Sequence, residues 1–175
     1  MKRTIKFRGQ KQTNGVWVYG CLVYSNEIDA SIYFQTGNGS VKTMDWVYVN
    51  PETVGQFTGL YDKDGKEIYE GDVVEYYEIG SYCINPDCEP HLIGYGTILH
   101  KRTEEVVCED CMFGIDYDTH IQSLANCGLI EEDIEYLKEQ ADEDVCFDTN
   151  GFTIDESILG IKVVGNVHEK KGGEK

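Results

Sequence analysis

The stretch from Thr58 to Tyr76, TGLYDKDGKEIYEGDVVEY, constrains the fold more than any other part of the sequence. Two short turns, at residues 62–65 and 70–72, separate runs that are rich in β-branched and aromatic residues. Each turn contains a glycine, Gly65 or Gly71, where a tight turn calls for positive φ. This pattern predicts short strands joined by tight turns, so we expect a mainly-β protein.

Two more hairpins are predicted before this stretch, because turn signals separate runs with strand composition. Asn14-Gly15 is the dipeptide that best fits a type I′ turn, and a Gly-Asn-Gly sequence at residues 37–39 marks the second hairpin. The strands are expected at residues 4–8, 16–24, 30–34 and 41–49. The second of these strands carries apolar side chains on both faces, so we expect it to be covered on both sides, most simply by a second copy in a homo-oligomer.

Three parts of the sequence carry a resemblance to a known family. They read IKFRG and GVWVYG in residues 5–20, VGQFTGLYDK and IYEGDVV in residues 54–74, and VVGNVHE in residues 163–169. In this order, and with this spread along the chain, they resemble the YopX family, whose members are encoded by phages and prophages. The resemblance implies an SH3-like β-barrel core and a phage origin, and it implies no particular reaction.

We expect the chain to form an N-terminal β-meander at residues 1–57 and an SH3-like barrel domain at residues 58–175. The barrel strands are expected within residues 58–77, 94–115 and 157–169. Residues 79–93 hold prolines and other turn-forming residues, which predicts a loop inserted into the barrel. Residues 116–156 are expected to form a second insertion that is acidic and partly helical.

Residues 118–144, inside the second insertion, are expected to be helical. Apolar residues recur there at helical spacing, and three acids would occupy the first turn, where the helix dipole favours anions. The apolar stripe consists of Ile130, Ile134, Leu137 and Ala141, and the acids are Glu131, Glu132 and Asp133.

The chain carries a formal net charge of −17, and one segment holds nearly all of it. Residues 104–156 contain 17 acidic side chains and 1 basic side chain, whereas residues 1–103 contain 13 acidic and 10 basic ones. Such a surface repels nucleic-acid phosphates, whose binding needs clustered Lys and Arg. The N-terminal strand opposes this trend with Lys2, Arg3, Lys6, Arg8 and Lys11. Nucleic-acid binding through this basic strand is therefore an alternative, beside an ordinary solvated strand face.

Seven cysteines without a secretory signal argue against a disulfide framework, because the cytosol keeps thiols reduced. Two pairs have a spacing that could hold one structural zinc ion. The candidate ligands are Cys83, Cys88, Cys108 and Cys111. In the competing interpretation, Cys108 is a strand residue that points into the core, and the first pair lies in a loop.

No sequence motif indicates a catalytic reaction, since the four histidines are scattered and none has a nucleophile at a motif spacing. Twelve tyrosines and two tryptophans could line a binding groove or fill the core of a small barrel. No run of 18 apolar residues occurs, so we expect no membrane-spanning helix. We expect a non-enzymatic phage or prophage accessory protein that needs no cofactor and acts through protein contacts in the host cytoplasm.

Overall fold

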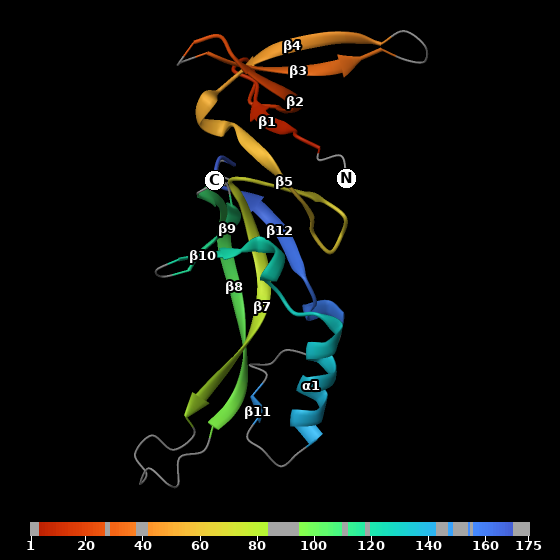
Figure 1. Cartoon of the computed structure of the whole chain (residues 1–175), viewed down its shortest axis with the longest axis vertical. Coiled ribbons are helices and arrows are strands. Elements are labelled where there is room, and N and C mark those ends of the chain that lie inside the picture. Colours follow the sequence, from red (N-terminus) through yellow and green to blue (C-terminus); the bar gives the residue numbers. More distant parts are fainter. Residues whose placement is uncertain are drawn as a thin grey trace, which may run out of the picture.

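The computed structural model describes residues 4–26, 29–37, 42–83, 95–109, 112–117, 120–142, 147–148, 154 and 156–169 of the chain. These residues form two six-stranded sheets, in which every pairing is antiparallel except that of β11 with β8. The first sheet lies at one end of an elongated molecule, and the second sheet runs along the rest with one helix beside it (Figure 1). The predicted mainly-β class is confirmed.

The first sheet contains the strands that turn chemistry predicted near the N-terminus. Its members are β1 (Phe7–Gln10), β2 (Trp17–Tyr24), β3 (Ala30–Thr36), β4 (Thr43–Val49), β5 (Gly55–Tyr61) and β6 (Glu67–Tyr69), in the order β4-β3-β2-β1-β5-β6. Both predicted hairpins form, β1 with β2 and β3 with β4. The first turn is longer than the expected two residues, because the N–H of Lys11 donates to the carbonyl of Val16 across residues 12–15.

The first sheet curls around its own core. The end of β4 returns to β1, where the N–H of Gln12 donates to the carbonyl of Tyr48 at 3.2 Å. The enclosed side chains include Ala30, Ile32 and Val49, which are fully buried. Only one side of each strand faces this core. Within one chain the strand expected at 16–24 is therefore covered on one side, and its expected cover by a second copy stays a prediction.

The second sheet follows the order β10-β9-β8-β7-β12, with β11 beside β8. Its strands are β7 (Asp72–Cys83), β8 (Tyr95–Glu109), β9 (Met112–Tyr117), β10 (His120–Ser123), β11 (Phe147–Asp148) and β12 (Ile161–Asn166). Val74, Tyr76 and Val106 are buried in its core. Within the described residues no pairing joins β10 to β12, so the second sheet is not a closed barrel, and the expected SH3-like barrel is not confirmed. The domain boundary expected after residue 57 falls inside β5, a strand of the first sheet. The segments just before and just after this boundary therefore belong to the same sheet.

The predicted loop at residues 79–93 and the predicted length of the helix differ from the structure. Residues 79–83, expected in a loop, continue β7 and pair with β8; residues 84–94 lie outside the described residues. The helix α1 (Glu131–Asp142) is shorter than the expected 118–144, because residues 120–123 form a strand. Within the described residues, no helix has the length and apolar character that crossing a membrane requires.

The helix α1 buries two of the four residues of its predicted stripe. Ile134 and Leu137 are buried with Leu99 and Ile158, whereas Ile130 is 58% exposed. The three predicted acids occupy the first turn of α1. One of them, Asp133, accepts a hydrogen bond from the N–H of Ile130 at 2.7 Å and so satisfies a backbone donor at the start of the helix.

The turn between β5 and β6 has the conformation that its sequence predicts. Gly65 has φ +79°, and Gly71 in the next turn has φ +77°. The buried carboxylate of Asp62 accepts the N–H groups of Lys66 at 2.8 Å and of Val163 at 3.1 Å, so the turn is tied to β12. The turn therefore helps to hold the first sheet against the second.

We expect Gly65→Val to lower the free energy of unfolding by about 1–3 kcal/mol, because a β-branched residue is strained at positive φ. Chemical denaturation of the purified protein measures the change. Lys66→Val, at the next exposed position of the same turn, is the matched control and should unfold close to the wild type. A Gly65→Val protein with wild-type stability would contradict the argument.

Candidate functional site

A buried ion pair joins the two sheets. The Arg8 guanidinium on β1 lies 2.8 Å from a carboxylate oxygen of Asp72, at the start of β7, and both side chains are less than a tenth exposed. Asp72 also accepts the N–H of Tyr69 at 2.8 Å, and Arg8 donates to the carbonyl of Glu70 at 3.1 Å. The side-chain amide of Asn166, on β12, donates to the carbonyl of Gly71 at 2.6 Å and reaches Asp72 at 3.4 Å. We call this set the junction.

Aromatic rings lie beside two cationic side chains, Arg8 on β1 and Lys6 just before this strand. The Arg8 guanidinium lies over the rings of Trp17 and Tyr69, at 4.7 and 4.8 Å from their centroids. Lys6 forms an ion pair with Glu67 at 2.6 Å, and the Tyr69 hydroxyl donates to the same carboxylate at 2.7 Å. Burial and this carboxylate raise the pKa of Tyr69 above its ordinary value. Both cations are therefore already paired with acids of the same chain.

The outer side of the curled first sheet presents aromatic and apolar side chains to solvent. They are Trp17, Tyr19, Cys21, Val23, Tyr33, Met44, Trp46 and Tyr48, which we call the aromatic face. Strand register aligns them, since Tyr33 lies opposite both Cys21 and Trp46. The Trp46 ring stacks on Tyr33, with centroids 6.1 Å apart, and meets the edge of Tyr48 at 5.0 Å. Met44 is 62% exposed, and Trp46 and Tyr48 are nearly half exposed.

None of the eight residues of the aromatic face is charged, and at its border the Lys6 ammonium, which lies 5.3 Å from the centroid of the Tyr19 ring, is paired with Glu67. The excess negative charge belongs to the other sheet and its helix, where Glu105, Glu109, Glu132 and Glu139 are all exposed. In Figure 1 the strands β3 and β4 lie at one end of the molecule and α1 lies toward the other. The molecule thus separates an apolar, neutral surface from an acidic one.

A model of the YopX protein family matches residues 6–171. The chain belongs to the YopX family. A comparison with curated proteins found no match. Among solved structures, the chain is similar to the protein EF1440 from Enterococcus faecalis, with 18% identity, 96% of each chain covered and a TM-score of 0.45.

The segments that carry the YopX resemblance meet at the junction. The first supplies Arg8, the second supplies Gly71 and Asp72, and the third supplies Asn166. These three segments are therefore far apart in the sequence but meet at one place in the fold. The motifs build the contact between the two sheets, and the aromatic face lies beside it.

Two of the four predicted zinc ligands, Cys83 and Cys108, lie in the described part of the chain, and the structure does not bring these two together. Cys83 lies opposite Tyr95 at one end of β8, and Cys108 lies thirteen positions further along the same strand. At about 3.3 Å per residue this separates the two by roughly 40 Å, which speaks against one four-cysteine site within a single chain. Cys88 and Cys111 lie outside the described residues. Cys108 is exposed on β8, so the expectation that it points into the core is wrong.

Cys127 is the buried cysteine among those described. Burial raises the pKa of its thiol to about 11, and the nearby Glu78 adds to the effect. A thiol with so high a pKa carries almost no thiolate at neutral pH, and thiolate is the reactive form. Cys127 therefore serves as part of the core, where it packs with Val106 and Ile115.

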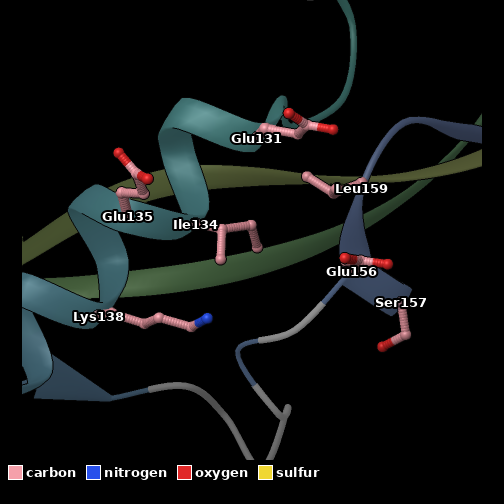
Figure 2. Close-up of a pocket in the computed structure, with 7 residues that line it drawn as sticks. All are labelled: Glu131, Ile134, Glu135, Lys138, Glu156, Ser157 and Leu159. Atoms are coloured by element: carbon pink, nitrogen blue, oxygen red, sulfur yellow. The ribbon is translucent and has the colours of Figure 1, made fainter.

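A groove between α1 and the segment before β12 has a volume of about 680 Å³. It is lined by Glu131, Ile134, Glu135, Lys138, Glu156, Ser157 and Leu159. Figure 2 shows Ile134 and Leu159 in the hollow, with acidic side chains around it. The acids are solvated and exposed, so the groove adds to the acidic character of this end of the molecule.

The outward residues of β4 were not predicted from the sequence as part of a site. Met44, Trp46 and Tyr48 alternate with Val47 and Val49, so both sides of this strand are apolar. This alternation can be read from the sequence, and it indicates a strand with apolar side chains on both sides. Which side faces outward depends on how the sheet curls, and the local pattern does not state that.

We expect Arg8→Met to lower the free energy of unfolding by about 3–5 kcal/mol, because it leaves the Asp72 carboxylate buried without its cation. Adding Asp72→Asn should restore part of the loss, since no uncompensated charge then remains. Urea denaturation of each variant measures both effects. Lys101→Met, which breaks the solvent-facing ion pair with Glu75, is the control and should leave stability nearly unchanged. Equal stabilities of Arg8→Met and Lys101→Met would contradict the argument.

For the cysteine pairs, we expect far less than one zinc ion per chain in freshly purified protein, because Cys83, the last residue of β7, lies opposite the first residue of β8, whereas Cys108 lies near the last residue of β8. Elemental analysis measures the zinc content. A content of one zinc ion per chain, lost in Cys108→Ser and kept in Cys127→Ser, would contradict this expectation and establish the zinc alternative.

Proposed function

We propose that this YopX protein is a non-enzymatic interaction module, a phage or prophage accessory protein that binds a protein partner through the aromatic face. The observation that carries the proposal is the cluster of half-exposed aromatic and apolar side chains on the first sheet. Soluble proteins rarely leave a contiguous apolar patch of this kind on their surface unless something covers it. As proposed, the protein acts in the cytoplasm of the host cell.

The composition of the aromatic face favours a protein partner. Tyrosine, tryptophan and methionine are enriched in protein interfaces, and charged residues are depleted at interface centres. Trp46 meets both Tyr33 and Tyr48 through ring contacts, so these anchors are held in place before any partner binds. Preorganised side chains lose less conformational entropy on binding.

The nucleic-acid alternative draws less support from the structure. It depends on the basic N-terminal strand, yet Arg8 is buried against Asp72 and Lys6 is paired with Glu67. Phosphate binding through these two cations would have to break their pairs, and the residues of the aromatic face supply no replacement charge. Stacking of bases on exposed aromatics remains chemically feasible, so the experiment below includes an outcome for it.

The buried polar groups support a role as a scaffold. Arg8 and Asp72 hold the two sheets together, and Asp62 binds backbone N–H groups in its own turn and in β12. The hydrogen bonds and the ion pair of these side chains are made within the chain itself, although the buried Nε of Arg8 has no hydrogen-bond partner in the described part of the chain. A rigid two-sheet frame of this kind presents the aromatic face in a fixed shape.

Affinity capture from cells that carry the phage or prophage tests the proposal. We expect the double variant Trp46→Ser/Tyr48→Ser to capture at least tenfold less of its protein partner than the wild type, because these side chains are the exposed anchors. Tyr24→Ser is the matched control: Tyr24 is equally exposed at the end of β2 but points to the other side. Circular dichroism and thermal melts show that each variant is folded.

Two outcomes would overturn the proposal. The first is equal capture of the same proteins by the double variant and the wild type. The second is capture of nucleic acid that falls steeply with rising salt, which would favour phosphate contacts over an apolar interface.

A further inference from the structure

We propose that the aromatic face binds the same face of a second copy of this chain, in a two-fold symmetric dimer. This inference rests on the proposed function and names the partner. A two-fold interface is self-complementary, so one patch on each copy is enough to form it. Flat aromatic side chains that carry no charge can pack against copies of themselves without an electrostatic penalty.

The charge distribution favours this arrangement. A chain with a net charge of −17 repels other copies of itself, and the excess resides in residues 104–156. The aromatic face has no charged member and belongs to the first sheet, whereas α1 and its acids pack on the second sheet. Pairing through the first sheets keeps the acidic parts of the two copies apart, whereas pairing through the second sheets would bring them together.

The edge of β4 argues for face-to-face packing over addition of a strand. Strand addition needs a row of unpaired backbone groups along an edge. Here the carbonyl of Tyr48 already accepts the N–H of Gln12, and the N–H of Trp46 is bound by the Asp45 carboxylate at 2.8 Å. The backbone of this edge is therefore partly occupied, and its exposed side chains remain as the binding surface.

The exposed area approaches what a stable dimer needs. A large aromatic side chain buries roughly 150–250 Å² when fully covered, so each half-exposed ring offers on the order of 100 Å², and exposed Val and Met side chains offer areas of the same order. Tyr19, Val23, Met44, Trp46 and Tyr48 are each between 44% and 62% exposed. Together they offer on the order of 500 Å², against about 800 Å² per partner in a standard interface. The intervening parts of β2 and β3 supply additional area.

Analytical ultracentrifugation of the purified full chain tests the dimer. We expect a species of twice the 19.8 kDa chain mass at micromolar concentration. Trp46→Glu should weaken the dimer at least tenfold, because two-fold symmetry places two new carboxylates in one interface. Met44→Glu is the second variant, at the most exposed position of the face, where a fold defect is least expected. Tyr24→Glu introduces the same charge on the other side of β2 and should remain a dimer.

Thiol protection supplies a second readout. Cys21 belongs to the aromatic face, and Cys108 is an exposed cysteine of the second sheet. Labelling resolved by peptide mass spectrometry should show Cys21 becoming protected as the protein concentration rises, while Cys108 stays equally reactive. In Trp46→Glu, the protection of Cys21 should be lost.

The outcomes separate this inference from the proposed function. A single 19.8 kDa species with Cys21 reactive at all concentrations would overturn the dimer. If the face variants then still lose a different protein in affinity capture, the proposed function stands with another partner. A dimer that persists in both Trp46→Glu and Met44→Glu would also overturn the inference, because it must use another surface.

Discussion

The buried Arg8–Asp72 ion pair is the contact on which the relative placement of the two sheets depends. Removing two charges from water is costly, and their attraction offsets that cost only when the remaining hydrogen-bonding groups are satisfied. Here Asp72 also binds the N–H of Tyr69 and the amide of Asn166, and the Arg8 guanidinium lies over two aromatic rings, with only its Nε left without a hydrogen-bond partner among the described residues. The pair therefore joins the first strand, the middle of the chain and the last strand at one point.

Glycines let the backbone come close enough for this contact. Gly71 takes φ +77°, a conformation that is strained for other residues, and its carbonyl accepts the Asn166 amide. A Cβ on Gly55 would collide with the carbonyl of Glu70, the same carbonyl that Arg8 binds. The glycines of the YopX segments thus have a physical role, which is to leave space for the junction.

Local patterns predicted the turns and most of the strands, because φ preferences and side-chain alternation act over a few residues. They failed where a residue has a tertiary role. Gly80 suggested a loop at residues 79–93, yet it lies within β7, where a Cβ would come within 2.7 Å of the His100 ring on β8. The glycine makes room for a neighbour and does not end the strand. Likewise, the alternation in β4 marks two apolar sides, but the curl of the sheet decides that Trp46 faces solvent.

Distances decide whether the acidic surface can prevent contacts at the aromatic face. The helix α1 packs near Ile79, seven residues along β7 from the junction, or roughly 20 Å at the rise of a strand. The Debye length at physiological ionic strength is about 8 Å, so repulsion from the acids of α1 is largely screened before it reaches the first sheet. Glu104 and Glu105 lie closer, opposite Val74 and Val73 beside the junction. Apolar burial, at roughly 25 cal/mol per Å², acts only on contact and is hardly affected by that screening. The same molecule can therefore be strongly acidic as a whole and still bind through a neutral surface, because the two effects operate at different ranges.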